Sequence, residues 1–210
     1  MFKRRSSDKR AQEAQGRRKR YLVTAFMALI MVSSIFGYII ANQTPGQQNN
    51  LDYNNFQIES TKTGYKVALD KDRSIITTDH PLSLENIKVD KKVWDILSAS
   101  RVIGVTYNQS DERAEVFGSA QFRLERDLAV APKSFVMRGL FDSTGTDLRN
   151  MTCRDATKEM PVIVLRIADE TMASADDSSC ITIEGFVGSD VERVADRIIL
   201  GLAGVMPRGG

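Results

Sequence analysis

The segment PVIVLRI, residues 161–167, is an almost unbroken run of apolar residues. Such a run predicts a strand that is covered on both of its faces. The next apolar run, CITIEGF at residues 180–186, alternates with polar residues and predicts a second strand. We expect both to be core strands.

The clearest amphipathic pattern of the chain follows the second strand. Gly188, Ser189 and Asp190 predict a turn into a helix, and Asp190 favours capping over phosphate binding because it supplies its own negative charge. Pro207 ends the helix, and residues 208–210 are expected to fray. The apolar stripe recurs at spacings of three and four, at Val191, Val194, Ala195, Ile198, Leu202, Val205 and Met206.

Strands and helices also alternate upstream. VIGVTY at 102–107 predicts a strand, Asp111 is expected to cap a helix over residues 112–128, and residues 134–137 predict another short strand. This alternation indicates an α/β (or α+β) sandwich with some parallel pairing. Residues 107–112 follow the carboxyl end of a strand, where α/β domains tend to bind ligands.

The domain begins with shorter β-like runs. Residues 56–58, 65–69 and 74–78 predict an antiparallel meander, and Asp90 is the expected N-cap of a short helix after it. A single domain over residues 53–207 is therefore expected.

A membrane anchor is predicted ahead of this domain. Residues 21–41, YLVTAFMALIMVSSIFGYIIA, hold no charge and no proline and reach about 31 Å as a helix, enough to span a bilayer. The end of the run lacks the small residue at −3 that signal peptidase favours, so the anchor should stay uncleaved. Ser33 and Gly37 could let two such helices pair into a homo-oligomer, or could simply face lipid.

The flanking charges predict the orientation of the anchor. Residues 1–20 hold nine Lys and Arg and two acidic residues, which predicts a cytoplasmic tail near anionic lipid headgroups. Residues 42–52 are polar and read as a flexible stalk to a domain outside the cell membrane. With 29 basic and 27 acidic residues in all, and none in the span, residues 42–210 keep 20 basic and 25 acidic, a net −5. That charge disfavours binding to nucleic acid.

The chain has two cysteines, Cys153 and Cys180, both in the predicted outer domain. An even pair in an oxidising exterior predicts a disulfide. A metal site or a catalytic thiol is the competing reading, but His80 is the only histidine, which makes a Cys/His zinc site poorly supported.

The sequence shows no catalytic signature: it holds no nucleophile elbow, P-loop, H-E-x-x-H or EF-hand spacing. A triad could use only His80, which we expect to be an exposed loop residue. Carboxylate pairs flank the stretch TMASA and are weak candidates for calcium ligands, or else a solvated loop: Asp169, Glu170, Asp176 and Asp177. No cofactor is predicted.

Three N-glycosylation sequons begin at Asn42, Asn108 and Asn150. All three fit an exported domain. Pro45 and the nearby membrane make Asn42 the least favourable acceptor.

The chain resembles a group of single-span archaeal membrane proteins that carry no established activity. The resemblance rests on the basic N-terminus, the span ending in MVSSIFGYII, then YNNFQIES, VIGVTYN and, most strongly, PVIVLRI, CITIEGF and DVERVADRIILGLAGVM in this order. Its last fifty residues are also loosely similar to strand–turn–helix units of archaeal cell-envelope and S-layer proteins. The resemblance implies an archaeal cell surface and transfers no catalytic residue.

Two classes of function remain. The first is a membrane-anchored interaction or structural protein of the cell envelope, or an accessory subunit of a membrane complex, whose partner is another envelope or membrane protein. The alternative is an anchored hydrolase or transferase that uses Asp or Glu residues with a divalent cation. The second class is supported only by architecture and by the acidic loop.

Overall fold

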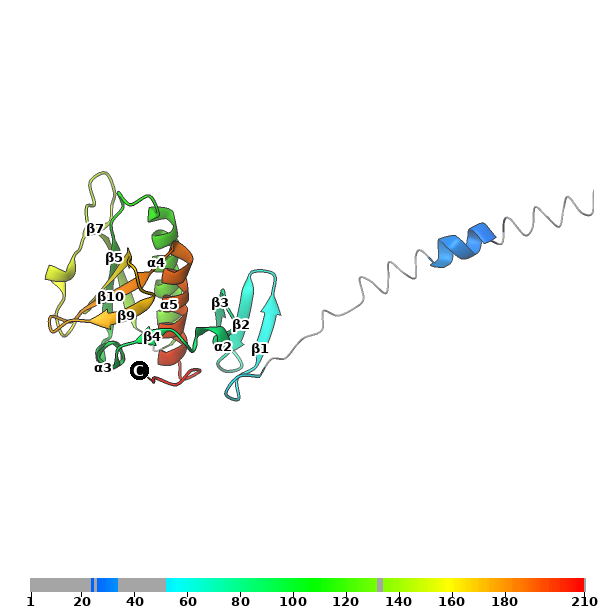
Figure 1. Ribbon diagram of the computed structural model, residues 1–210, viewed down its shortest axis with the longest axis horizontal. Helices are drawn as coiled ribbons and strands as arrows, with labels where there is room; N and C mark the ends of the chain where they lie inside the picture. Colours follow the sequence, from blue (N-terminus) through cyan, green and yellow to red (C-terminus); the bar gives the residue numbers. More distant parts are fainter. Residues whose placement is uncertain (1–23, 25, 34–51, 132–133, 210) are drawn as a thin grey trace, which may run out of the picture. The chain divides into compact units, whose positions relative to one another are not determined.

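The computed structural model describes Thr24 and residues 26–33, 52–131 and 134–209 (Figure 1). The chain divides into two units, Met1–Gln48 and Asn49–Gly210. In the first unit the described residues are helical and exposed. The predicted tail, residues 42–51 of the predicted stalk and most of the predicted span lie outside the described residues, as does Gly37. Within the described part of the chain, no helix has both the length and the apolar character needed to cross a membrane.

The second unit opens with the predicted antiparallel meander. β1 (Ile58–Thr61), β2 (Gly64–Ala68) and β3 (Ser74–Thr77) form a three-stranded sheet in chain order. Ile58 pairs with Val67, and Val67 pairs with Ile75, so all three share one face of this sheet. These three side chains are fully buried, and they attach the small sheet to the main core.

A larger mixed sheet holds the other seven strands, in the order β4-β9-β10-β8-β5-β6-β7. β10, β8, β5, β6 and β7 run parallel, whereas β9 is antiparallel to β10 and parallel to β4. The strands are β4 (Lys88–Val89), β5 (Val102–Tyr107), β6 (Phe135–Leu140), β7 (Arg149–Asn150), β8 (Val162–Ile167), β9 (Met172–Ala175) and β10 (Cys180–Gly185). The predicted α/β class and the partly parallel pairing are confirmed.

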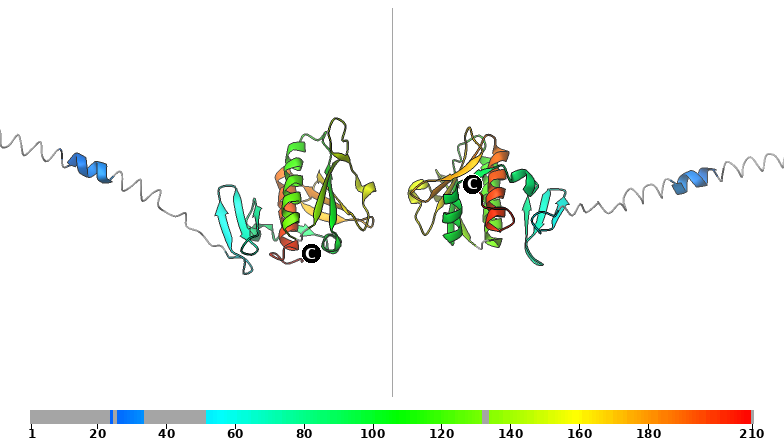
Figure 2. Two further views of the ribbon diagram at one scale, coloured as in Figure 1. Left: turned by 180° about the vertical axis from the view of Figure 1, so that it is seen from behind. Right: turned by 60° about the horizontal axis from the view of Figure 1, so that its bottom comes forward.

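Two long helices, α4 (Ala114–Val130) and α5 (Gly188–Leu202), lie side by side between the two sheets (Figures 1 and 2). Every residue of α5 from Val194 to Leu202 is buried, including the charged Asp196 and Arg197. The predicted apolar stripe therefore describes only the side of α5 that faces the large sheet. The small sheet covers its opposite side, which is why charged residues of this helix are also buried.

Short helices complete the fold. α2 (Pro81–Leu84) and α3 (Lys91–Ala99) precede β5, and the 3-10 helix η1 (Cys153–Asp155) precedes β8. Asp90 is the residue before α3, as predicted, although its side chain makes no capping hydrogen bond.

Strand β8 is covered on both faces, as its apolar run predicted. Ile163 and Leu165 belong to the main core beneath the helices. Val162 and Val164 point to the other face, where they form a second small core with Met151 and Cys180. The apolar run of β8 is thus explained by burial on both faces, against the main core on one side and the second small core on the other.

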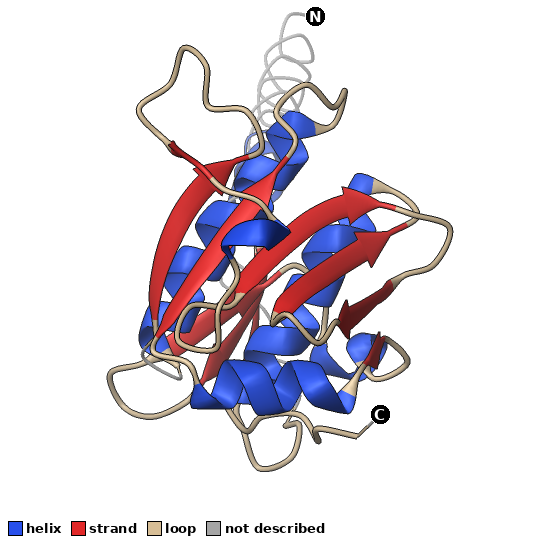
Figure 3. Ribbon diagram, turned by 90° about the vertical axis from the view of Figure 1, so that its left-hand side faces the viewer, coloured by secondary structure: helices blue, strands red, loops and turns tan. Residues whose placement is uncertain are grey.

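The second cover comes from the chain between β7 and β8, which crosses the face of the sheet opposite the helices (Figure 3). Met151 lies on two glycines of the sheet: a Cβ atom on Gly104 would stand 2.6 Å from its Sδ, and one on Gly139 2.5 Å from its Cβ. Thr106 Oγ1 donates to the Met151 carbonyl at 2.8 Å. Only residues without side chains let this segment approach so closely.

Several predicted boundaries are wrong. Helix α5 ends at Leu202, not at Pro207, because the chain turns at Gly204, whose positive φ of 77° does not continue a helix. Helix α4 begins at Ala114, not Glu112, because Asn108 Oδ1 accepts from Ser110 N and Asp111 Oδ1 accepts from Arg113 N, and these turns compete with the helix. Strand β6 runs on to Leu140. The stretch TMASA, expected to be a loop, contains strand β9, which forms because it pairs with β10.

Cys153 and Cys180 form a disulfide, as predicted, with their Cα atoms 5.2 Å apart. The bridge ties η1 to the first residue of β10 and so holds the crossing segment on the sheet.

Reducing this disulfide should lower the free energy of unfolding by about 3–4 kcal/mol, because it closes a loop with a sequence separation of 27 residues. Denaturant unfolding with and without a phosphine reductant measures the difference. Coincident curves, with mass spectrometry confirming free thiols in the reduced sample, would contradict the stabilising role.

Replacing Val194 by Asp should destabilise the fold by several kcal/mol, since Val194 is fully buried in the main core and the new carboxylate would have no partner. Val187→Asp is the matched control, because Val187 is 46% exposed at the N-cap of the same helix, where Asp is favourable. Thermal melts compare the two, and equal melting temperatures would rule out the packing described.

Candidate functional site

A recess of about 330 Å³ opens between the small sheet and the two central helices. Hydroxyl and charged side chains dominate its lining, which consists of Thr63, Ile76, Thr77, Thr78, Ser119, Arg123, Arg126 and Glu192. These residues come from the end of β3, the loop before β2, and helices α4 and α5. The layering of the fold, rather than sequence proximity, therefore creates the recess.

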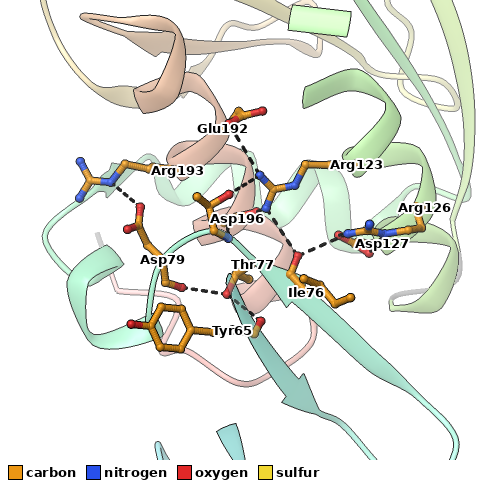
Figure 4. Close-up of polar contacts among 11 residues, drawn as sticks. Tyr65, Ile76, Thr77, Asp79, Arg123, Arg126, Asp127, Glu192, Arg193 and Asp196 are labelled. Carbon is orange, nitrogen blue, oxygen red and sulfur yellow. Dashed lines mark hydrogen bonds and ion pairs between the residues drawn. The ribbon is translucent and has the colours of Figure 1, made fainter. Parts of the chain in front are cut away.

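Arg123 of α4 is the centre of the recess (Figure 4). Its guanidinium pairs with Asp196 of α5, donates to Thr78 Oγ1 at 2.7 Å and lies 3.9 Å from Glu192. Asp196 in turn accepts from the backbone N–H of Thr78 at 3.0 Å. One ion pair thus ties α4, α5 and the end of β3 together.

The outer strand of the small sheet is held by a second arginine. Arg126 Nη2 donates to the Ile76 carbonyl at 3.4 Å, and Arg123 Nη2 approaches the same oxygen at 3.5 Å. Arg126 also forms hydrogen bonds of 2.6 and 2.7 Å with the buried Asp127. The Ile76 carbonyl on the edge strand β3 therefore accepts hydrogen bonds from arginine side chains of α4 instead of from another strand.

Burial controls the protonation of Asp196, whose side chain is fully covered. Loss of solvation raises its pKa from 3.8 to about 6, although the charge of Arg123 and the N–H of Thr78 both act to lower it. The nearby carboxylate of Asp127 adds a smaller upward push.

A second group of contacts joins α5 to the segment after β3. Arg193 lies 3.1 Å from Asp79 and 3.3 Å from Asp190. Thr77 Oγ1 donates to the Asp79 carbonyl at 2.8 Å, so the segment after β3 is fixed at two points.

The polar groups of the recess bind one another. Its two arginines bind Asp196, Asp127 and the Ile76 carbonyl, and the hydroxyl of Thr78 accepts from Arg123. None of the residues that line it is a histidine or a cysteine that could activate a hydroxyl group. We therefore interpret it as the junction that fastens the small sheet.

His80 is less exposed than predicted. Its Nδ1 accepts from Leu82 N at 3.2 Å, which makes it the N-cap of α2, and the rings of Tyr53 and Tyr65 approach it edge-on at 6.4 and 5.3 Å. Burial lowers the pKa of the imidazole. Its role is local packing, and a Ser-His-Asp triad is not formed by the described residues around it.

The four predicted calcium candidates fall into two separate places. Asp169 and Glu170 precede β9 and Asp176 and Asp177 follow it, so the strand separates the pairs by about 13 Å. Asp176 accepts from Ser178 and Cys180 in a turn, and these hydrogen bonds lower its pKa, while Asp177 pairs with Lys92. Among the described residues, no three His, Cys, Asp or Glu side chains gather in a way that could hold a metal ion.

Two of the three predicted sequon asparagines, Asn108 and Asn150, are exposed. The predicted turn at Gly188–Asp190 forms the first turn of α5, where Asp190 Oδ2 accepts from Val187 N at 3.3 Å. Asp190 thus caps the helix, as expected, and occupies the place that an anion would take.

The carboxyl edge of the parallel strands is the most distinctive outer surface. Three connections meet there, at residues 108–113, 141–148 and 168–171, next to Phe186 and Val187. Phe186 is 65% exposed, Val187 46% and Phe141 37%. The connections also carry one basic residue, Arg113, and six acidic residues: Asp111, Glu112, Asp142, Asp147, Asp169 and Glu170. We call these residues the acidic aromatic edge.

Sequence reasoning found part of this edge and missed the recess. It selected residues 107–112 by position and Asp169 and Glu170 by charge, and the parallel sheet brings both groups to one side. It missed the pair of Arg123 and Asp196, which are distant in sequence. The available signal was the alternating apolar face of β1–β3, which needs a covering surface and finds it on α4 and α5.

Asp196→Asn should change how stability depends on pH. The pKa of Asp196 is raised on folding, so its contribution to stability is complete below about pH 3.8 and is lost as the pH rises through about 6. Relative to the Asn variant, the parent should lose about 2 kcal/mol between pH 4 and pH 7. Denaturant unfolding across this range measures the difference, with the exposed Asp95→Asn as control. Equal pH dependence in parent and Asn variant would refute the assignment.

The resemblance to archaeal membrane-anchored proteins stays a prediction. In comparisons with protein-family models, curated proteins and solved structures, none matches this chain.

Proposed function

We propose that this protein is a membrane-anchored, extracytoplasmic interaction protein of the cell envelope, or an accessory subunit of a surface or membrane complex. The acidic aromatic edge is the observation that carries the proposal. Its Phe186, Val187 and Phe141 bring three exposed apolar side chains to one edge of the sheet, and a group of such side chains with a polar rim is typical of an interaction site.

Aromatic side chains at a surface are the usual anchors of protein–protein contacts. At this edge they stand on short connections that a parallel sheet positions, because each connection starts at the end of a buried strand. Such a surface can present its side chains with little loss of conformational entropy on binding.

Two further features support the location. The disulfide between Cys153 and Cys180 is typical of an oxidising compartment outside the cytoplasm. Residues 21–41, with the basic residues 1–20 before them, are the predicted anchor that would hold the domain there.

A photo-crosslinking amino acid at position 186 should give one discrete adduct with an envelope or membrane protein in intact cells. Position 135 is the matched control, because Phe135 is also 65% exposed but begins strand β6 at the opposite edge of the sheet. Equal or absent crosslinking at the two positions would count against an interaction at this edge.

The location is tested in the same cells. Protease added from outside should cleave the domain after residue 52 and leave residues 1–20 intact. Digestion of residues 1–20 alone would show that the topology is the reverse of the predicted one, and it would refute the proposed function.

A further inference from the structure

We infer that the acidic aromatic edge binds a basic protein segment that carries apolar side chains. The inference rests on the proposed function and names the chemistry of its partner. Three properties of the edge support it: its charge, the spacing of its apolar side chains, and its place relative to the point where the chain enters the domain.

The edge holds nearly all of the domain's excess negative charge. Residues 42–210 have a net charge of −5, and the three connections of the edge, with six acidic residues and Arg113, account for the same value. The rest of the domain is therefore balanced. A charge confined to one edge steers an oppositely charged partner to that edge.

Most of these carboxylates are not neutralised within the protein. Glu112, Asp147, Asp169 and Glu170 are exposed and make no ion pair with any residue that the structure describes. Asp111 has Arg113 at 3.6 Å, and Asp142 accepts hydrogen bonds from Thr144 within its own loop.

Neighbouring basic residues leave this charge largely in place. Arg166 pairs with Glu184, and Arg193 pairs with Asp79 and Asp190. Two exposed basic residues near the edge make no ion pair with the residues that the structure describes: Arg149 on the outer strand β7, and Lys88 of β4, which is in register with Met172. Lysine or arginine side chains from another protein can therefore form new pairs at the edge without first breaking internal ones.

The apolar side chains set the length of the partner segment. Phe186 follows β10 and Phe141 follows β6, with β8 and β5 between them, so three strand spacings of about 4.8 Å place them about 14 Å apart. An extended chain covers this distance in about four to five residues. A segment of at least this length, alternating basic and apolar residues, can contact both phenylalanines and the carboxylates between them.

The position of the edge favours a separate partner over the chain's own stalk. The chain enters the domain at the C-terminal end of α5, where Asn54 Nδ2 donates to the Val205 carbonyl at 3.1 Å. Val187 and Phe186 lie at the N-terminal end of this helix, whose 15 residues extend about 22 Å. The edge is thus at the far end of the domain from residue 52.

The test uses the full chain in neutral phosphatidylcholine nanodiscs, with empty nanodiscs as the blank. The probe is a fluorescent eight-residue peptide of alternating lysine and leucine, and the comparison peptides alternate glutamate with leucine and lysine with glycine. We expect only the lysine–leucine peptide to bind measurably, and its affinity to fall as salt is added.

Two pairs of variants locate the binding. Asp169→Asn with Glu170→Gln should weaken binding by about fivefold, because two attractive pairs with lysines of the peptide are lost. Glu59→Gln with Asp95→Asn removes two exposed carboxylates elsewhere and should leave the affinity within about twofold. Phe186→Ser should weaken binding in the same way, whereas Phe135→Ser should not.

Several results would overturn the inference. Equal binding by all variants, equal binding of the lysine–glycine peptide, or saturable binding of calcium chloride that is lost with Asp169→Asn and displaces the peptide would each do so. If the peptide does not bind but crosslinking at position 186 is specific, the partner chemistry is refuted and the proposed function stands. Peptide binding together with a reversed topology would support the partner chemistry and refute the proposed function.

Discussion

The rest of this structure depends on the ion pair between Arg123 and the buried Asp196, which lies where three layers meet. Helix α5 has apolar residues for the large sheet on one side and must accept the small sheet on the other. Asp196 falls on that second side, and a buried carboxylate is tolerated only with charge and hydrogen-bond partners, here Arg123 and Thr78. Removing either charge would leave the other stranded, so the pair fixes which element of the small sheet meets which helix. This is a specificity role more than a source of net stability.

The two polar regions of the domain differ because their surroundings differ. In the recess, acids and arginines are drawn together by burial and satisfy one another. At the acidic aromatic edge, water supplies the solvation, so Glu112, Asp169 and Glu170 can remain without partners. A parallel sheet produces this second surface naturally, because every strand that ends in the same direction delivers its connection to one side. The proposed interaction surface is a product of topology, and the recess is a product of packing.

Much of the fold could be predicted because its signals are local. The runs at 102–107, 161–167 and 180–186 and the stripe from Val191 are dictated by their own periodicity. The disulfide could be predicted from an even number of cysteines together with the predicted compartment. The predictions that failed depended on which segments lie side by side in the fold. The sequence MASA at residues 172–175 has weak strand preference and is a strand only because β10 pairs with it. Met151 crosses the sheet because Gly104 and Gly139 leave room, which no periodicity encodes. The calcium hypothesis joined two acidic pairs by sequence distance, whereas an intervening strand sends them to opposite edges.

The opposite placement of the chain's entry and the exposed phenylalanines also has a mechanical consequence. If the proposed anchor and the proposed partner hold the domain at its two ends, tension between them would act along α5, from the Asn54–Val205 contact to the helix N-terminus. Such a force would have to break many side-chain contacts of α5 at the same time rather than one after another. The Cys153–Cys180 bridge lies on the far face of the large sheet, outside this line of force. The packing of α5 would then resist the stretching force. Reduction of the disulfide would lower the stability against denaturant far more than the force needed to unfold the domain.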